Sequence, residues 1–231
     1  MVNAMTARPS PADQMRLPLQ RDLPDGAEGF VTSDCNRAAV EALADWPNLI
    51  GGVMAICGPA GCGKSRVAQV WAERVGAVAI HGGEAALIDP LELEGRAVLL
   101  DPASEVDDET LFHLINLAHA PGGALLLVAR SAPSRWEAAL PDLRSRLDAI
   151  RTYPIEVPDD AVLTAMLEAR FAERGIRPQK DVIPYLLRRI DRSAAAAASV
   201  VETLDALHKP VTRVLAREAL DDAEQGGDLF D

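Results

Sequence analysis

A glycine-rich stretch at residues 58–65, with the sequence GPAGCGKS, constrains this chain more than any other part of the sequence. It matches the pattern G-x-x-x-x-G-K-[ST], a loop that binds the phosphates of nucleoside triphosphates. The run before it, residues 53–57, is short, apolar and partly β-branched, which is typical of a buried strand. The run after it, residues 64–74, is rich in helix formers with apolar residues at helical spacing. The chain therefore supplies the strand, loop and helix that this pattern requires.

Each part of the loop has a chemical role. Its glycines let the backbone turn sharply, so that several N–H groups and the positive end of the helix dipole point at one place. Lys64 is expected to reach the β- and γ-phosphates, and the Ser65 hydroxyl to bind Mg²⁺. The alternative is an ordinary glycine-rich turn, which the complete pattern in its required context disfavours. The predicted nucleotide-binding residues of the loop are Gly58, Pro59, Ala60, Gly61, Cys62, Gly63, Lys64, Ser65 and Arg66.

The composition and net charge of the chain exclude several classes of function. Of 231 residues, 48% are hydrophobic and only 4% aromatic, so the core must be mostly aliphatic. The net charge of −12 argues against a broad nucleic-acid footprint, and we expect no direct sequence-specific DNA binding. The three cysteines show no C-x-x-C spacing, which indicates reduced thiols. No secretory signal or membrane-length apolar run is present, so we expect a cytoplasmic protein without membrane contact.

Strands and helices alternate through the first two thirds of the chain. This alternation predicts an α/β fold, a three-layer parallel sheet with helices on both faces. The continuous apolar run at residues 123–129 is typical of a parallel strand covered on both sides. The expected strands are residues 53–57, 77–81, 96–101, 123–129 and 153–157, and the expected helices are residues 36–44, 64–74 and 108–118.

After Pro158 the pattern becomes helical. Asp159 and Asp160 are candidate caps for a helix that Gly175 ends, and helices are expected at residues 181–190, 193–207 and 212–220. These helices predict a small all-helical domain, or lid, after the sheet. The predicted organisation is a flexible arm at 1–28, a nucleotide-binding α/β domain at 29–157, the lid at 158–220 and an acidic tail at 221–231.

Asp101 ends an apolar strand about 40 residues beyond the phosphate loop, where such sites carry a carboxylate for Mg²⁺. The alternative is a turn-capping aspartate, since Asp-Pro often opens a turn. The residue after it is Pro102, which cannot take or orient a proton as a catalytic carboxylate would. The site is therefore expected to hold a nucleotide and to cleave it weakly or not at all.

Two further stretches remain open from pattern alone. Residues 140–148 predict a short helix whose Arg144 and Arg146 are either solvated surface or, for Arg146, an arginine that acts on a nucleotide held by another subunit. Residues 14–19, QMRLPL, form an apolar cluster in the arm. They are either a docking peptide or a segment in which Leu17 and Leu19 pack back on the domain.

Together the phosphate loop, the strand that ends in Asp101, the segment LPDLRSRLD at 140–148 and the helical lid resemble the AAA+ ATPases. Phe30 followed by NRAAV at 36–40 resembles the box that opens the DnaA-related branch. The segments 140–148 and 185–192 (YLLRRIDR) are most similar to the Hda family of regulators, which inactivate the replication initiator. The resemblance covers about residues 12–220.

This resemblance implies a mechanism. A family member that holds ADP, or ATP, with Mg²⁺ docks on the DNA sliding clamp and contacts ATP-bound DnaA. It then stimulates DnaA to hydrolyse its ATP. Arg146 matches the arginine finger that acts in trans, while Lys64, Ser65 and Asp101 match the nucleotide and Mg²⁺ site. ADP-dependent self-association is left open. The arm matches the clamp-binding peptide through Gln14, Met15, Leu17, Pro18 and Leu19.

The sequence departs from the family in the lid. The position at which family members usually carry the sensor-2 arginine falls near Ala195, and the nearest arginine, Arg192, lies one turn earlier. The sensor-1 region carries Arg130-Ser131, whose role stays open. The C-terminus resembles a second clamp peptide, and the alternative is an ordinary acidic tail. The residues concerned are Gln225, Asp228, Leu229 and Phe230. Two other readings of the whole chain remain: a self-sufficient P-loop ATPase, and a clamp-bound scaffold or recruitment platform with a vestigial nucleotide site.

Overall fold

The structure, a computed structural model, describes residues 31–44, 46 and 52–227. Its sheet has five parallel strands in the spatial order β2-β3-β4-β1-β5. The strands are β1 (Gly52–Cys57), β2 (Val78–Ile80), β3 (Ala97–Leu100), β4 (Ala124–Ala129) and β5 (Arg151–Pro154).

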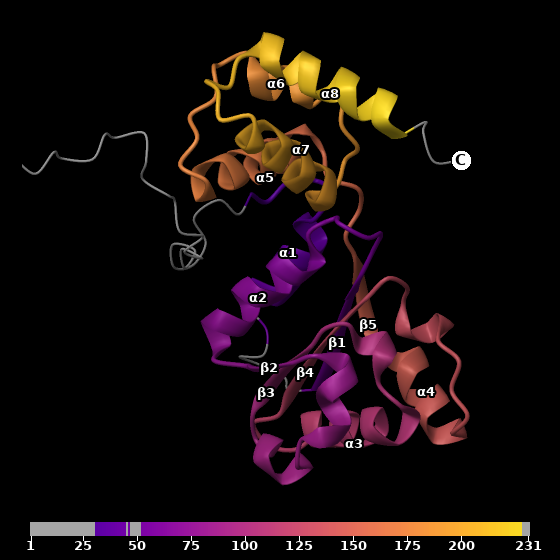
Figure 1. Cartoon of the computed structure of the whole chain (residues 1–231). Coiled ribbons are helices and arrows are strands. Elements are labelled where there is room, and N and C mark those ends of the chain that lie inside the picture. Colours follow the sequence, from indigo (N-terminus) through magenta and orange to yellow (C-terminus); the bar gives the residue numbers. More distant parts are fainter. Residues whose placement is uncertain (1–30, 45, 47–51, 228–231) are drawn as a thin grey trace, which may run out of the picture.

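Helices cover both faces of this sheet, because side chains alternate across each strand and both sets are apolar. Met54 and Ile56 face one core, which they share with α1 (Arg37–Ala44) and α2 (Lys64–Val75). Ala55 faces the other core, under α3 (Asp108–Ala118) and α4 (Pro141–Ala149). The predicted three-layer α/β architecture is therefore confirmed (Figure 1).

A separate helical domain follows the sheet and has its own buried core, centred on Leu163, Phe171 and Val201. It lies at one end of the molecule, above the sheet in Figure 1. The Asp159 side chain caps its first helix through the Val162 amide, at 3.0 Å. The helices of this lid are α5 (Asp160–Glu173), α6 (Val182–Leu186), α7 (Ala194–Ala206) and α8 (Arg213–Gly227).

Some boundaries differ from those expected. The fifth strand, expected at 153–157, begins at Arg151 and ends at Pro154. It is an edge strand with half-exposed, partly polar side chains, so hydrophobicity does not mark it. Helix α6 ends at Leu186, short of residue 190, and α8 continues past Leu220 to Gly227. Between β2 and β3, the short 3₁₀ helices Gly82–Leu87 and Pro90–Leu93 were not expected.

The arm peptide at 14–19 lies outside the described residues, as do Asp228, Leu229 and Phe230 of the second tail peptide. Gln225 falls within the backbone of α8. In the part of the chain that the structure describes, no helix combines the length and apolarity needed to cross a bilayer.

Candidate nucleotide-binding site

The phosphate loop leaves the carboxyl end of β1 and enters α2 at Lys64, the strand–loop–helix arrangement that the sequence predicts. Cys57, the last residue of β1, is paired with Ala129, the last residue of β4. On the next strand, Leu100 is paired with Leu127 of β4. Because parallel strands end at one edge of a sheet, Asp101 and Arg130 follow their strands at the same edge as the loop.

Glycines are required at two positions of the loop. Gly61 has a left-handed φ of +71°, and a Cβ there would lie 2.8 Å from the Ser193 Cβ. Gly58 lies so close to the next backbone that a Cβ would come within 2.1 Å of the Ile155 carbonyl oxygen. Side chains at either position would displace the loop, so its path depends on these glycines.

Lys64 is half-buried and folds back over the loop. Its Nζ donates hydrogen bonds to the carbonyl oxygens of Gly58, at 2.9 Å, and Pro59, at 2.7 Å. Ser65 is exposed in the first turn of α2, where the helix has free amide groups and its positive dipole end. A cation, a hydroxyl and a helix N-terminus in this order suit a bound phosphate chain.

Asp101 follows β3 directly and is half-buried, while its amide donates to the Ile80 carbonyl at 3.1 Å. Its carboxylate and the Ser65 hydroxyl are hard oxygen donors of the kind that Mg²⁺ prefers. These two residues fit a magnesium ion held through nucleotide phosphates. Pro102 occupies the following position, joined to Asp101 by a cis peptide bond.

The lid contacts the loop directly, a feature that the sequence pattern did not reveal. The Ala194 amide, at the start of α7, donates to the Gly61 carbonyl at 2.8 Å. Met166 of α5 lies next to Gly63 of the loop, since its Cε is 3.3 Å from the place that a Cβ of Gly63 would occupy. The lid is therefore joined to the loop by a backbone hydrogen bond and by a close side-chain approach.

Arg192 stabilises the hinge of the lid. Its guanidinium donates to Asp160 at 2.5 Å and to the Pro158 carbonyl at 3.2 Å. Both partners lie at the junction between the sheet domain and α5. Arg192 is thus held at this junction, and helix α7, which follows it, contains no arginine.

Arg135 is a basic residue near the site that the sequence analysis missed. It lies in the short 3₁₀ turn Pro133–Arg135 after β4. Burial raises the pKa of the Cys57 thiol, and the positive charges of Lys64 and Arg135 oppose that shift. Arg135 is thus close to the end of β1, where it adds positive potential. Cys35, Cys57 and Cys62 are free thiols, and burial likewise raises the pKa of Cys35.

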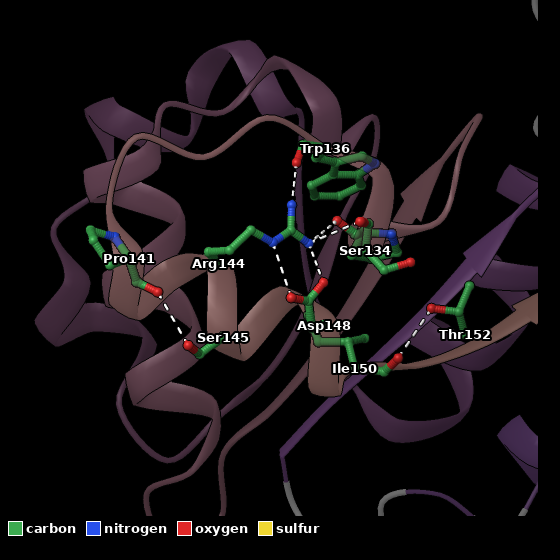
Figure 2. Close-up of polar contacts among 9 residues, drawn as sticks. Ser134, Trp136, Pro141, Arg144, Ser145, Asp148, Ile150 and Thr152 are labelled. Atoms are coloured by element: carbon green, nitrogen blue, oxygen red, sulfur yellow. Dashed lines mark hydrogen bonds and ion pairs between the residues drawn. The ribbon is translucent and has the colours of Figure 1, made fainter.

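Arg144 and Arg146 have different surroundings on α4. Figure 2 shows the Arg144 guanidinium inside a ring of acceptors: it pairs with Asp148 at 2.5 Å and donates to the carbonyls of Trp136, at 2.5 Å, and Ser134, at 3.0 Å. Arg146 instead lies over the Phe112 ring of α3, 4.9 Å from its centroid. Arg144 is therefore structural, and Arg146 keeps a charge that no described carboxylate neutralises.

Known proteins with the same architecture include DNA replication initiators. No protein-family model matches the chain. The chain is 30% identical over 121 residues to the chromosomal replication initiator protein DnaA of Thermomicrobium roseum. That match covers 50% of this chain and spans 26%, about a quarter, of the relative's length.

Solved structures agree in fold. Domain III of the Thermotoga maritima replication initiation protein DnaA superimposes with a TM-score of 0.72 at 18% identity, over 84% of this chain and 95% of that one. AMPPCP-bound DnaA from Aquifex aeolicus gives a TM-score of 0.61 at 17% identity, over 76% of this chain and 63% of that one. The RuvB branch migration motor of Thermotoga maritima gives a TM-score of 0.63 at 13% identity, over 86% of this chain and 72% of that one. The chain thus has the AAA+ fold, in the form seen in domain III of DnaA.

Proposed function

We propose that this chain is an adenine-nucleotide-binding regulator of DNA replication initiation, a cytoplasmic protein of the Hda type. It docks on the DNA sliding clamp, the β subunit of DNA polymerase III, and stimulates ATP hydrolysis by DnaA in trans through Arg146. The observation that carries the proposal is the contrast on α4: the Arg144 guanidinium donates to five oxygens, whereas Arg146 lies over an aromatic ring and keeps its charge.

The phosphate loop is the proposed site of the chain's own nucleotide, ADP or ATP. Lys64 and the amides at the start of α2 would bind the phosphates, and Ser65 and Asp101 would hold Mg²⁺. The magnesium ion would shield the charge of the phosphates while it is bound. Two solved structures of DnaA with the same fold are bound to AMPPCP, which supports an adenine nucleotide here.

The chain's own site is poorly equipped for hydrolysis. A P-loop enzyme needs a group that orients the attacking water. Pro102, directly after Asp101, offers no side-chain proton acceptor. We therefore expect intrinsic ATPase activity to be weak or absent, with hydrolysis occurring on the partner.

The position of Arg146 suits action on a partner. The phosphate-loop helix α2 packs on one face of the sheet, and α4 packs on the other through Leu143 and Leu147. Arg146 is therefore presented on the face opposite α2. Placed against the γ-phosphate of a neighbouring subunit, its guanidinium would stabilise the charge of the transition state, an effect worth about 10³–10⁵-fold in known cases. DnaA, whose domain III shares this fold, is the proposed neighbour.

Docking on the clamp is assigned to the arm. Gln14 would donate and accept hydrogen bonds, and the apolar side chains would fill a pocket on the clamp. A second contact through the C-terminal peptide is the alternative. The arm residues concerned are Gln14, Met15, Leu17, Pro18 and Leu19.

The experiment that tests the proposal reconstitutes DnaA loaded with labelled ATP, the clamp on DNA, and this chain with ADP. We expect hydrolysis to accelerate with the intact chain and to fall to the basal rate with Arg146→Ala or with Gln14→Ala combined with Leu17→Ala. Arg96→Ala, an exposed arginine outside α4, is the matched control and should keep full activity.

Other outcomes distinguish the remaining readings. Turnover of ATP by the isolated chain would favour a self-sufficient ATPase. Stimulation that survives Lys64→Ala would leave the chain's own nucleotide site vestigial. Clamp binding with no stimulation, unchanged by Arg146→Ala, would indicate a scaffold or recruitment platform.

A further inference from the structure

A small pocket lies in the lid between α6 and α8, away from the phosphate loop. The lid meets the loop through α5 and the first residues of α7, whereas α6 and α8 lie at the far end of the lid in Figure 1. The pocket encloses about 220 Å³. It is lined by Asp181, Pro184, Tyr185, Arg188, Arg189 and Arg213.

Three arginines gather around this pocket, although the chain as a whole carries a net charge of −12. The guanidinium carbons of Arg189 and Arg213 each lie 5.4 Å from the centroid of the Tyr185 ring. A shared ring holds both planar cations in place without neutralising them, which brings like charges together. A bound anion would reduce the electrostatic repulsion between these like charges.

Carboxylates do not neutralise this cluster in the part of the chain that the structure describes. Arg188, Arg189 and Arg213 form no ion pair there. The Asp181 side chain lines the pocket but is not within ion-pair distance of the guanidinium groups, so the pocket keeps an excess of positive charge. By contrast, carboxylates do pair with other arginines of the described chain, among them Arg144, Arg170, Arg174 and Arg192.

Tyr185 contributes its ring, and not its hydroxyl, to the pocket. The Tyr185 Oη is shielded from solvent and forms no hydrogen bond with any described residue. Buried hydroxyls normally have a partner, because an unmade hydrogen bond costs free energy. Because the Oη is out of reach of solvent, a ligand in the pocket does not contact it, and Tyr185 acts through the ring that holds Arg189 and Arg213.

The size of the pocket and its donors indicate what it binds. Sites for whole small-molecule ligands usually enclose about 300–1,000 Å³, so this pocket suits a smaller group. Guanidinium groups match the tetrahedral oxygens of phosphate, and several donors can be used at once because phosphate offers more acceptor oxygens than a carboxylate. We propose that Arg188, Arg189 and Arg213, which gather around the Tyr185 ring, form a binding site for a phosphate group, distinct from the phosphate loop.

Calorimetric titration of the full chain tests this site. The Lys64→Ala variant serves as the background, so that the phosphate loop does not supply the signal. Pyrophosphate and inorganic phosphate are one arm, and a short single-stranded oligonucleotide with or without a 5′-phosphate is the other. Binding of pyrophosphate alone would identify a free phosphate ligand; binding of the oligonucleotide dependent on its 5′-phosphate would identify a nucleic-acid end.

Substitutions assign the signal to the pocket. Arg189→Gln with Arg213→Gln should weaken binding by about tenfold or more, since charge-assisted hydrogen bonds are lost. Arg217→Gln, an exposed arginine on the same helix α8, should leave the affinity unchanged. Tyr185→Phe keeps the ring that holds Arg189 and Arg213, so it should leave the affinity unchanged while thermal stability stays equal or rises, because the removed hydroxyl has no partner in the protein.

Two results would overturn the proposal: no saturable binding of any of these probes to the Lys64→Ala chain, or equal affinity in the Arg189→Gln, Arg213→Gln double variant. The measurement uses neither DnaA nor the clamp. Its failure would therefore leave the proposed regulatory function untouched, and failure of that function would not affect this site.

Discussion

The guanidinium of Arg146 lies over the ring of Phe112, with 4.9 Å between the guanidinium carbon and the ring centroid. Arg146 comes from α4 and Phe112 from α3, two helices that cover the same face of the sheet. The face of an aromatic ring attracts a cation but carries no net charge. This contact therefore orients Arg146 without neutralising it, as a residue that acts on another protein's phosphate requires.

Phe112→Leu should lower the maximal rate at which the chain stimulates DnaA hydrolysis. A cation–π contact contributes about 0.5–2 kcal/mol, so we expect a loss of several-fold. Phe112→Tyr keeps the aromatic face and should restore the rate. Titrating the chain against a fixed amount of DnaA separates the maximal rate from the half-saturating concentration. An unchanged maximal rate in Phe112→Leu would show that the ring does not position Arg146.

Arg144→Ala should cost more stability than Arg146→Ala. Arg144 pairs with Asp148 and donates to three carbonyl groups, so its removal should lower the free energy of unfolding by about 1–3 kcal/mol. Arg146 makes one ring contact, so its removal should cost about 1 kcal/mol or less. Urea denaturation of both variants measures the difference. Equal losses of stability would contradict the distinct roles assigned to the two arginines.

Gly61→Ala should loosen the contact between the phosphate loop and the lid. The residue has a φ of +71°, and an added methyl group would come 2.8 Å from the Ser193 Cβ. We expect weaker ADP binding and faster hydrogen exchange at the Ala194 amide, whose bond to the Gly61 carbonyl would be disturbed. Gly83→Ala is the matched control, because its φ is not in the left-handed region and a Cβ there meets only ordinary contacts. Unchanged exchange at Ala194 in Gly61→Ala would count against the coupling.

Asp159 should make the stability of the chain depend on acid pH. The hydrogen bond from Ser33, followed by those from amides of α5, holds the pKa of Asp159 below its ordinary value of 3.8. A lowered pKa stabilises the fold above the unfolded-state value, and this stabilisation is lost as pH falls through the folded-state value.

Asp159→Asn keeps a capping side chain but removes the charge. We expect it to be about 0.5–1 kcal/mol less stable than the parent at neutral pH. The difference should vanish well below pH 4, where both unfolded and folded carboxyl groups become protonated. Urea denaturation across this range measures it, and a deficit that stays constant into strong acid would contradict the assigned charge effect.

Much of the fold follows from local patterns in the sequence. The apolar strands at 53–57 and 123–129 are buried on both faces, so their hydrophobicity identifies them and their parallel pairing. Helix α3 begins at Asp108 and ends at Ala118 as expected, because Asp107 caps it and its apolar face is regular. The edge strand β5 was misplaced, because an exposed edge does not need an apolar run.

The candidate site was only partly predictable. Residues of the loop are adjacent in sequence, so the pattern alone identifies Gly58 to Ser65. The contact of Ala194 with Gly61 joins residues far apart in sequence, and neither has a side chain that signals it. The contact between Arg146 and the Phe112 ring could not be predicted for the same reason, because in the sequence Phe112 is one of several apolar residues in a helix.

The rate at which ATP bound to DnaA is hydrolysed in a single turnover tests the central claim most directly. The comparison is between the intact chain, Arg146→Ala and Arg146→Lys, each with ADP and the clamp loaded on DNA. The account predicts stimulation by the intact chain, a loss of about 10³-fold or down to the basal rate in Arg146→Ala, and little recovery in Arg146→Lys, which lacks the planar guanidinium. Full stimulation by Arg146→Ala would contradict the account.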